Sequence, residues 1–155
     1  MDATTENGIK AIKQARAGLI ATGIPFVETP QDEPSDVDGF FLNADETEVV
    51  ACFEAKARSM SLAELKEMGG EWLVSAQKVV KGREMARRLR VPFYGVLYLV
   101  PDKITMLVLI ADKDGEIACG IRYAVTETQA TCNGGTARRK NAFIDMKQSK
   151  RWRAK

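Results

Sequence analysis

The sequence predicts an α/β fold in a single domain, and three observations support this prediction. The chain has 155 residues, 45% of them hydrophobic, which is enough to build one buried core. Two stretches, 5–22 and 71–90, repeat their apolar residues at helical spacing. Two others, 91–101 and 104–112, are apolar runs rich in β-branched and aromatic residues, which is typical of central buried strands.

Cap and turn residues predict the elements of the first third of the chain. The first helix is expected to begin near Thr4 or Thr5 and to end at Gly23. Its predicted sheet-facing residues are Ile9, Ile12, Leu19 and Ile20. Residues 24–30 predict a short strand, and an acidic, proline-containing loop follows at 31–36.

The second helix, 71–90, follows a glycine pair that separates it from the preceding segment. Its buried stripe is predicted to comprise Trp72, Ala76, Val79, Ala86 and Leu89. A turn at 101–103 joins the two apolar strands. A second turn at 112–115 is expected to lead into a final strand at 116–125.

Residues 36–56 combine β-strand patterning with charged side chains. The segments 35–43 and 47–56 are predicted to form a β-hairpin around a short polar turn. Because side chains alternate between the two faces of a strand, Glu54 and Lys56 emerge on the same face. An apolar strand therefore presents two opposite charges side by side.

The register of the hairpin decides what lies opposite Glu54. If a three-residue loop at 45–47 closes the hairpin, Leu42 pairs with Val50 and Asp38 pairs with Glu54. Two carboxylates and a neighbouring lysine amine are then expected to share one patch.

Two carboxylates a few ångströms apart repel each other, and a divalent cation with oxygen ligands is the usual reason to hold them together. The sequence thus suggests a magnesium site at Asp38 and Glu54. Lys56 could orient or deprotonate an attacking water and offset the charge of a phosphate, as phosphodiester hydrolysis requires. The other interpretation is a surface Glu-x-Lys pair, worth less than about 1 kcal/mol.

This arrangement resembles the motif of the PD-(D/E)xK nuclease superfamily, an Asp at the start of one strand followed by Glu-x-Lys at the end of the next. The matching residues are Asp38 in VDGFF and Glu54 and Lys56 in VVACFEAK. The family's order of helix, three strands, helix and strand can be read over residues 8–100. One departure is that the proline is not adjacent to Asp38; Pro34 precedes Asp36, which leaves Asp36 as an alternative metal ligand.

The resemblance implies a restriction-endonuclease-like fold, a mixed β-sheet flanked by helices with an α-β-β-β-α-β core. It also implies a DNA nuclease that depends on Mg²⁺, with Mn²⁺ as a substitute. The small size and the lack of an accessory domain are similar to Holliday-junction resolvases and small repair nucleases, which commonly act as homodimers. A DNA endonuclease of repair or recombination is therefore expected, with an exonuclease or a non-catalytic nucleic-acid-binding protein as alternatives.

The family also places a Gln or Lys on the helix after Glu-x-Lys, and in some members a metal-binding Glu on the first helix. The residues at these positions are Gln77, Lys81 and Glu6. Each has a second interpretation. Gln77 and Lys81 also fit a solvated helix face, and Glu6 also fits an acidic residue that complements a helix N-terminus.

Several residue types and motifs are missing from the chain. It has no histidine, which removes histidine-dependent triads, histidine-based zinc hydrolysis and nucleases with a histidine base. It has no P-loop motif, and its three cysteines form no C-x-x-C pair. Chemistry by carboxylate, lysine and metal remains.

The sequence shows no long apolar run and begins with MDATTENG, so neither a membrane span nor a secretory leader is expected. A cytoplasmic location is the corresponding expectation.

Charge is distributed unevenly although the net charge is only +2. Residues 1–56 carry four Lys and Arg against eleven Asp and Glu, whereas residues 57–155 carry 19 against 10. We expect a nuclease-like domain over 1–135 and a basic segment of the same domain over 136–155, which could be partly disordered. Its candidate phosphate ligands are Arg138, Arg139 and Lys140. The alternative is a frayed, solubilising tail.

Overall fold

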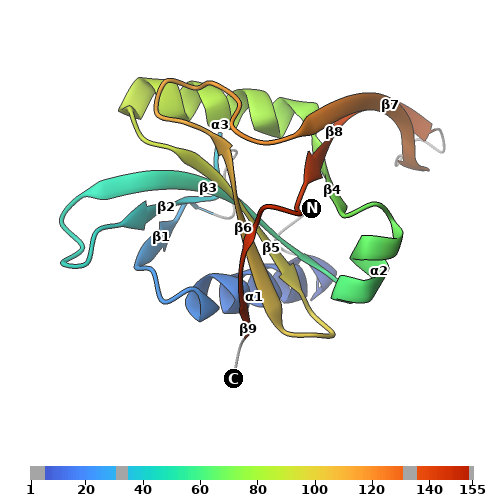
Figure 1. Cartoon of the computed structure of the whole chain (residues 1–155), viewed down its shortest axis with the longest axis horizontal. Helices are drawn as coiled ribbons and strands as arrows, with labels where there is room; N and C mark the ends of the chain where they lie inside the picture. Colours follow the sequence, from blue (N-terminus) through green and yellow to red (C-terminus); the bar gives the residue numbers. More distant parts are fainter. Residues whose placement is uncertain (1–5, 31–34, 131–135, 154–155) are drawn as a thin grey trace.

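The computed structural model describes residues 6–30, 35–130 and 136–153, which have a mixed α/β architecture (Figure 1). The helices of this part are α1 (Glu6–Ala21), α2 (Leu62–Glu67) and α3 (Ala76–Leu89). The larger sheet contains, in spatial order, β1 (Phe26–Glu28), β2 (Gly39–Leu42), β3 (Val49–Arg58), β5 (Phe93–Leu99), β6 (Ile104–Ala111) and β9 (Lys150–Arg153). The smaller sheet contains β4 (Glu71–Ser75), β8 (Thr136–Asp145) and β7 (Ile121–Ala130).

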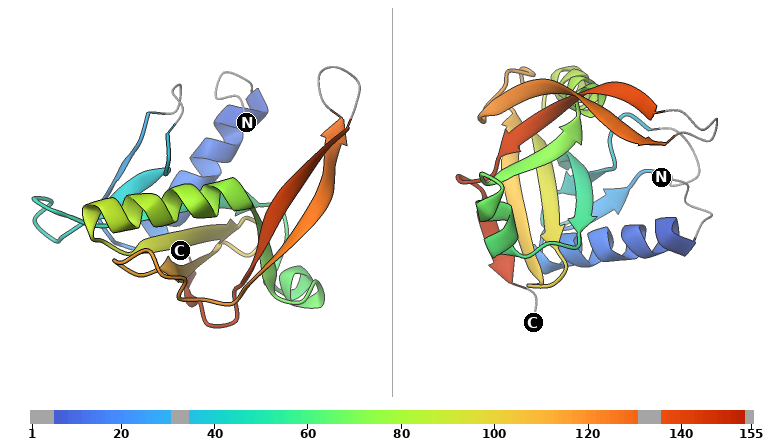
Figure 2. Two further views of the ribbon diagram at one scale, coloured as in Figure 1. Left: turned by 90° about the horizontal axis from the view of Figure 1, so that it is seen from above. Right: turned by 90° about the vertical axis from the view of Figure 1, so that its right-hand side faces the viewer.

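The larger sheet separates the two long helices (Figure 2). β3 and β5 run parallel, whereas the other neighbouring strands in this sheet are antiparallel. Along β3, Phe53 belongs to a core cluster with Leu19 of α1, and Cys52 belongs to a second cluster with Val79 of α3. The prediction of a mixed sheet flanked by helices is therefore confirmed.

α1 has the predicted extent, but a different face of it is buried. Leu19 is buried as predicted, whereas Ile9 and Ile20 are 44% and 64% exposed, so their assignment to the sheet-facing side was wrong. α1 contacts the sheet at Gly18, where an added Cβ would lie 2.7 Å from the Tyr98 side chain. The helix and the sheet approach so closely there that a small residue, and not an isoleucine, marks the packed face.

The hairpin of β2 and β3 departs from the predicted register near its turn. A bulge lies between Phe41 and Leu42, so Leu42 pairs with Val49 and not with Val50. The Asn43 side-chain oxygen accepts hydrogen bonds from the backbone N–H groups of Thr47 and Glu48. These bonds constrain the conformation of the turn, and the alternation of residues along the strands does not reveal them. On the far side of the bulge the strands follow the predicted register.

Residues 71–75 form β4, so the prediction that a helix begins at residue 71 was wrong. Trp72 and Val74 are buried in the main core, and β4 pairs along its whole length with β8. The Ser75 side chain accepts a hydrogen bond from the Lys78 N–H, and α3 begins at Ala76. Pairing with a strand distant in sequence outweighed the local helical pattern.

Within α3 the predicted buried stripe is confirmed at Ala76, Val79 and Ala86, and it is wrong at Leu89, which is exposed. α3 lies very close to β5, because a Cβ added at Gly82 would meet the Phe93 ring at 2.2 Å. This close approach fixes the helix over the sheet, with Lys78 of its first turn near Glu54 of β3.

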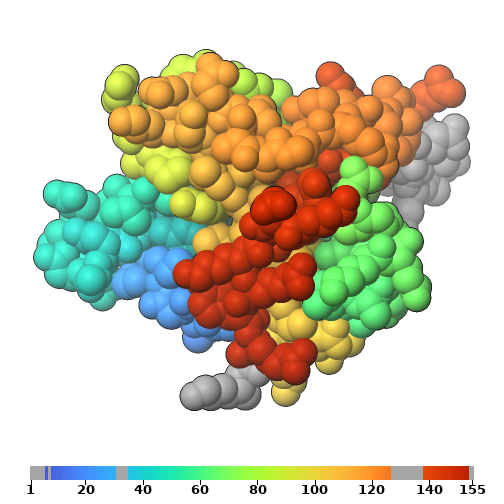
Figure 3. Space-filling model, in the orientation of Figure 1, coloured from blue at the N-terminus to red at the C-terminus, as the bar shows by residue number. Residues whose placement is uncertain are grey.

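The C-terminal third of the described chain is β structure. β7 begins at Ile121, later than the predicted strand at 116–125, and it is not the final strand, because β8 and β9 follow. β8 lies between β4 and β7, and β9 pairs with the edge of β6. Figure 3 shows this C-terminal segment, in red, lying against the rest of the molecule. None of the helices described here is long and apolar enough to span a membrane.

Candidate active site

The structure brings Asp38 and Glu54 together at the point where β2 begins. The ladder between β2 and β3 ends at the pair Gly39 and Phe53, and Asp38, the residue before Gly39, lies close enough to Glu54 for its charge to act on that carboxyl. The Asp38 N–H donates to the Phe53 carbonyl oxygen at 2.9 Å, which continues the ladder past the end of β2. The Glu54 side chain lies on the face of β3 that is turned toward α3, because it follows Cys52 by two residues along the strand.

Glu54 is a buried acid with incomplete hydrogen bonding. Its side chain is 1% exposed, and its Oε1 has no hydrogen-bond partner among the described residues. Its Oε2 lies 3.9 Å from Nζ of Lys78. The pKa of Glu54 is raised to about 8, first by burial and then by the negative charge of Asp38, while the charges of Lys78 and Lys56 oppose the shift.

Asp38 is fixed at the edge of the sheet. Its Oδ2 accepts a hydrogen bond from the Ala55 N–H at 2.9 Å, and its carbonyl oxygen accepts one from the Thr29 N–H at 2.9 Å. The N–H and C=O of one strand residue point to the same side of the strand, so the Ala55 carbonyl faces the same edge. A third oxygen thus lies beside the two carboxylates.

Lys56 follows Glu54 on the same face and lines a pocket of about 590 Å³. α1, the end of β1, the start of β2, β3 and α3 all contribute to this pocket. Its polar lining residues include Asp38, Lys56, Arg58, Lys78 and Lys81. Glu54 is not part of the lining, since it is buried below the pocket surface.

Of the two residues predicted on α3, Lys81 lies at the pocket, whereas Gln77 is one position away from the residue that reaches Glu54. Gln77 is exposed, and Lys78 is the residue close to Glu54. Lys81 lines the pocket and its Nζ lies 3.7 Å from Oδ1 of Asp36. The buried residues Ala76 and Val79 have the predicted orientation, so Lys78 reaches Glu54 from the position beside Gln77. Lys78 and Lys81, three residues apart, share the pocket-facing side.

The two candidates for an additional metal ligand are not part of the pocket lining. Asp36 is paired with Lys81, and its side chain is 45% exposed. Glu6 is exposed and lines a different pocket, together with Tyr98 and Lys103. Asp38 is therefore the aspartate that the geometry favours as the partner of Glu54.

Arg58 was missed by the sequence analysis. It follows Lys56 by two residues, so the alternation that joins Glu54 to Lys56 also places Arg58 on this face. The side chain is half-buried and lines the pocket. Burial lowers the pKa of its guanidinium, and the charge of Glu54 opposes that effect.

The donor set fits magnesium. Among the described residues there is no group of three or more His, Cys, Asp or Glu side chains that could hold a metal. Mg²⁺, however, commonly binds through one or two carboxylates and completes its shell with water and substrate phosphate oxygens. The unpartnered Oε1 of Glu54 next to Asp38 is the observation that fits a cation between them.

Comparisons of the chain with protein-family models, with curated proteins and with solved structures found no significant match. The function must therefore be inferred from the geometry and chemistry of the site.

The raised pKa of Glu54 predicts a stability effect in the metal-free protein. Between pH 4.5 and about 8 the unfolded chain releases the Glu54 proton while the folded chain retains it, so stability falls as pH rises through this window. Glu54→Gln removes this loss. In EDTA, the free energy of unfolding of Glu54→Gln is compared with that of the wild type at each pH. The difference between them is expected to shift in favour of the variant, by on the order of a few kcal/mol, from pH 5 to pH 9.

Urea denaturation at pH 5 and pH 9 measures this effect, with Glu84→Gln on the exposed side of α3 as the matched control. The control is expected to show equal differences from the wild type at both pH values. A Glu54→Gln variant that gains no stability between pH 5 and pH 9 would show that the carboxyl is not held in its neutral form.

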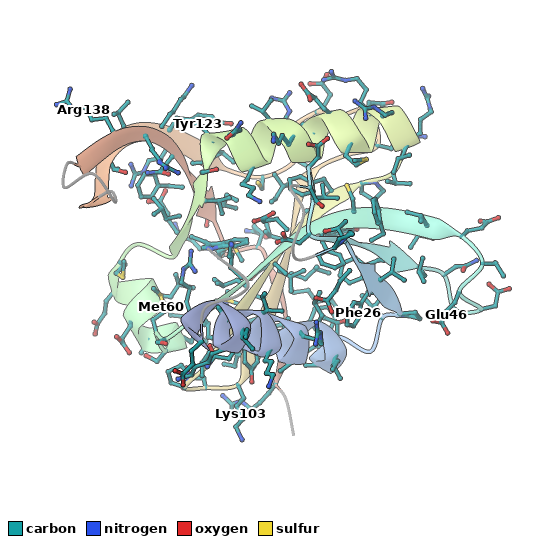
Figure 4. All side chains as sticks on the ribbon, turned by 180° about the vertical axis from the view of Figure 1, so that it is seen from behind. Phe26, Glu46, Met60, Lys103, Tyr123 and Arg138 are labelled. Carbon is teal, nitrogen blue, oxygen red and sulfur yellow. The ribbon has the colours of Figure 1, made fainter. Side chains whose placement is uncertain are left out.

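The predicted phosphate ligands Arg138, Arg139 and Lys140 are exposed and lie on β8. β7 and β8 extend from the body as a two-stranded arm (Figure 2). Along a strand, Arg138 and Lys140 share one face and Arg139 lies on the other. Lys140 Nζ lies 4.8 Å from the ring centroid of Tyr123, and Arg138 is farther out on the arm than Tyr123 (Figure 4).

Proposed function

We propose that the protein is a metal-dependent nuclease that hydrolyses phosphodiester bonds in DNA. The observation that carries the proposal is the pair formed by Asp38 and the buried Glu54, with Lys56 next on the same face at the opening of a pocket. Burial and then the neighbouring charge of Asp38 raise the pKa of Glu54, and a divalent cation is the partner that would lower it again.

Each side chain has a role that its position permits. Asp38 and Glu54 would hold Mg²⁺ or Mn²⁺, which supplies Lewis-acid chemistry at the phosphate when bound. Lys56 positions the attacking water or accepts its proton, because its amine is in the pocket and close enough to Glu54 to affect the pKa of that group. Lys78 offsets the charge of Glu54 from the side of α3.

The order of elements supports a restriction-endonuclease-like assignment of the fold. α1, β1, β2, β3, α3 and β5 follow one another as helix, three strands, helix and strand. α2 and β4 are additional elements between β3 and α3. Within this class we favour a homodimeric endonuclease that acts on branched or damaged DNA, such as a Holliday-junction resolvase, over an exonuclease.

A non-catalytic nucleic-acid-binding protein is the second candidate, and one observation favours it. Glu54 is buried below the pocket surface and already has Lys78 as a cationic neighbour, as a structural ion pair would. In that case the protein is expected to bind DNA without cutting it.

Cleavage of a panel of linear, single-stranded, flapped and four-way-junction DNA distinguishes the two candidates. The nuclease is expected to cut at least one substrate in Mg²⁺ or Mn²⁺ and none in EDTA. Binding of the panel without cleavage in either metal would overturn the nuclease assignment in favour of the binding protein.

The arm predicts different effects for neighbouring basic residues. Arg138 and Lys140 share a face with Tyr123, so replacing both by alanine is expected to weaken DNA binding and to flatten its salt dependence by about one to two units. Arg139→Ala removes an equally exposed charge from the opposite face and is expected to change the slope less. Fluorescence anisotropy across a range of salt concentrations measures both variants. Equal slopes for all the proteins would exclude the arm from the binding surface.

A further inference from the structure

The pocket extends beyond Lys56 along a stretch of β3 that, among the described strands, has no partner on the side of β2. The ladder between β2 and β3 ends at the pair Gly39 and Phe53, and the Asp38 carboxylate takes the next backbone donor, Ala55 N–H. Two residues further, the N–H of Ala57 faces the same edge, where β2 offers it no partner. Ala57 and Arg58 both line the pocket.

Arg58 adds a cation to this edge. Within the described parts of the chain its guanidinium makes one hydrogen bond, from Nη1 to the Ala57 carbonyl oxygen at 3.2 Å, and no ion pair with a carboxylate. A half-buried guanidinium with most of its donors unused suits an anion supplied from outside the chain. The same donors would suit a phosphate, which takes bidentate hydrogen bonds from arginine.

The distance along β3 between Lys56 and Arg58 relates the Arg58 guanidinium to the proposed reaction. Lys56 and Arg58 are two residues apart on one face, a step of about 6.6 Å along a strand. One nucleotide of an extended strand separates its phosphates by a comparable distance. A strand whose reacting phosphate lies at Asp38 and Lys56 would therefore bring its next phosphate to Arg58.

We propose that Arg58 and the Ala57 N–H form a second phosphate subsite, which binds the phosphate adjacent to the one that is cleaved. This inference rests on the proposed nuclease function for the identity of the first phosphate. The subsite itself requires only a ligand with two phosphates one nucleotide apart. It makes Arg58 a binding residue, and the residues assigned to the chemistry remain Asp38, Glu54 and Lys56.

Calorimetry with two small nucleotides tests the subsite without a cleavable substrate. In Mg²⁺ buffer, thymidine 3′,5′-bisphosphate is expected to bind the full chain at least about tenfold more tightly than thymidine 5′-monophosphate, as one charge-assisted contact permits. Arg58→Gln is expected to abolish that preference. Arg88→Gln, on the exposed end of α3, removes the same charge outside the pocket and is expected to retain it.

The outcomes separate this inference from the proposed function. The wild-type comparison needs no substitution, so equal binding of the two nucleotides, or binding of neither, overturns the subsite whatever Arg58→Gln does to the fold. Arg58→Lys, which keeps the charge but loses the bidentate fork, is expected to show an intermediate preference. A bisphosphate preference that depends on Arg58 in a protein that cuts no DNA would retain the subsite and reject the nuclease.

Discussion

Asp38→Asn is expected to lower the rate of magnesium-dependent DNA cleavage by roughly a thousandfold or more, because it removes a charged ligand whose cation supplies several kcal/mol of transition-state stabilisation. The fold should be retained, since the asparagine carbonyl oxygen can still accept the hydrogen bond from the Ala55 N–H. Single-turnover cleavage at saturating protein measures the rate, and thermal melting checks the fold.

Asp36→Asn is the matched control for this experiment. Asp36 is two residues away, carries the same charge, and is paired with Lys81 on the exposed side of the site. Its replacement is expected to leave the cleavage rate within a small factor of the wild type. Near wild-type cleavage by Asp38→Asn, or an equal loss in both variants, contradicts the assignment of Asp38 as the ligand.

Lys56→Met is expected to reduce the single-turnover rate by about 10²- to 10⁴-fold, the range that a positioned acid or base contributes. Methionine keeps the apolar stem of the lysine but removes the amine that lines the pocket. Metal affinity should stay within a small factor of the wild type, because Lys56 is not a ligand. Calorimetry of Mn²⁺ binding and single-turnover cleavage together separate the two effects.

Lys66→Met, on the exposed side of α2, is the corresponding control and should change neither quantity. If both lysine variants lose the same fraction of activity, general electrostatic attraction of DNA explains the effect of Lys56. If Lys56→Met instead loses metal affinity together with activity, the amine acts on the metal site and not on the attacking water.

Local sequence patterns predicted most of the fold that surrounds the site. The alternation along residues 49–56 predicted which side chains of β3 share a face, and the register through Phe53 predicted that Asp38 lies close to Glu54. These features depend on neighbours in sequence or on one short hairpin. The bulge near Leu42 was not predictable from alternation, yet it lies on the turn side of the strands, and the pairs from Gly39 to Phe41 keep the predicted register.

Features that depend on distant partners could not be predicted. Residues 71–75 read as helix because the strand with which they pair, β8, lies about 70 positions later in the sequence. The predicted buried face of α3 was retained, and Lys78 was missed because it lies one residue beside the predicted pair Gln77 and Lys81. Arg58 could have been found, since the same alternation that joins Glu54 to Lys56 extends to it.

The central claim, that Asp38 and Glu54 hold a divalent cation, is tested most directly by the anomalous scattering of crystals grown with Mn²⁺. The account predicts a single strong peak within coordination distance of both carboxylates and of the Ala55 carbonyl oxygen, and no such peak in crystals of Asp38→Asn. A map without a peak at this position, with Lys78 still paired to Glu54, would contradict the account.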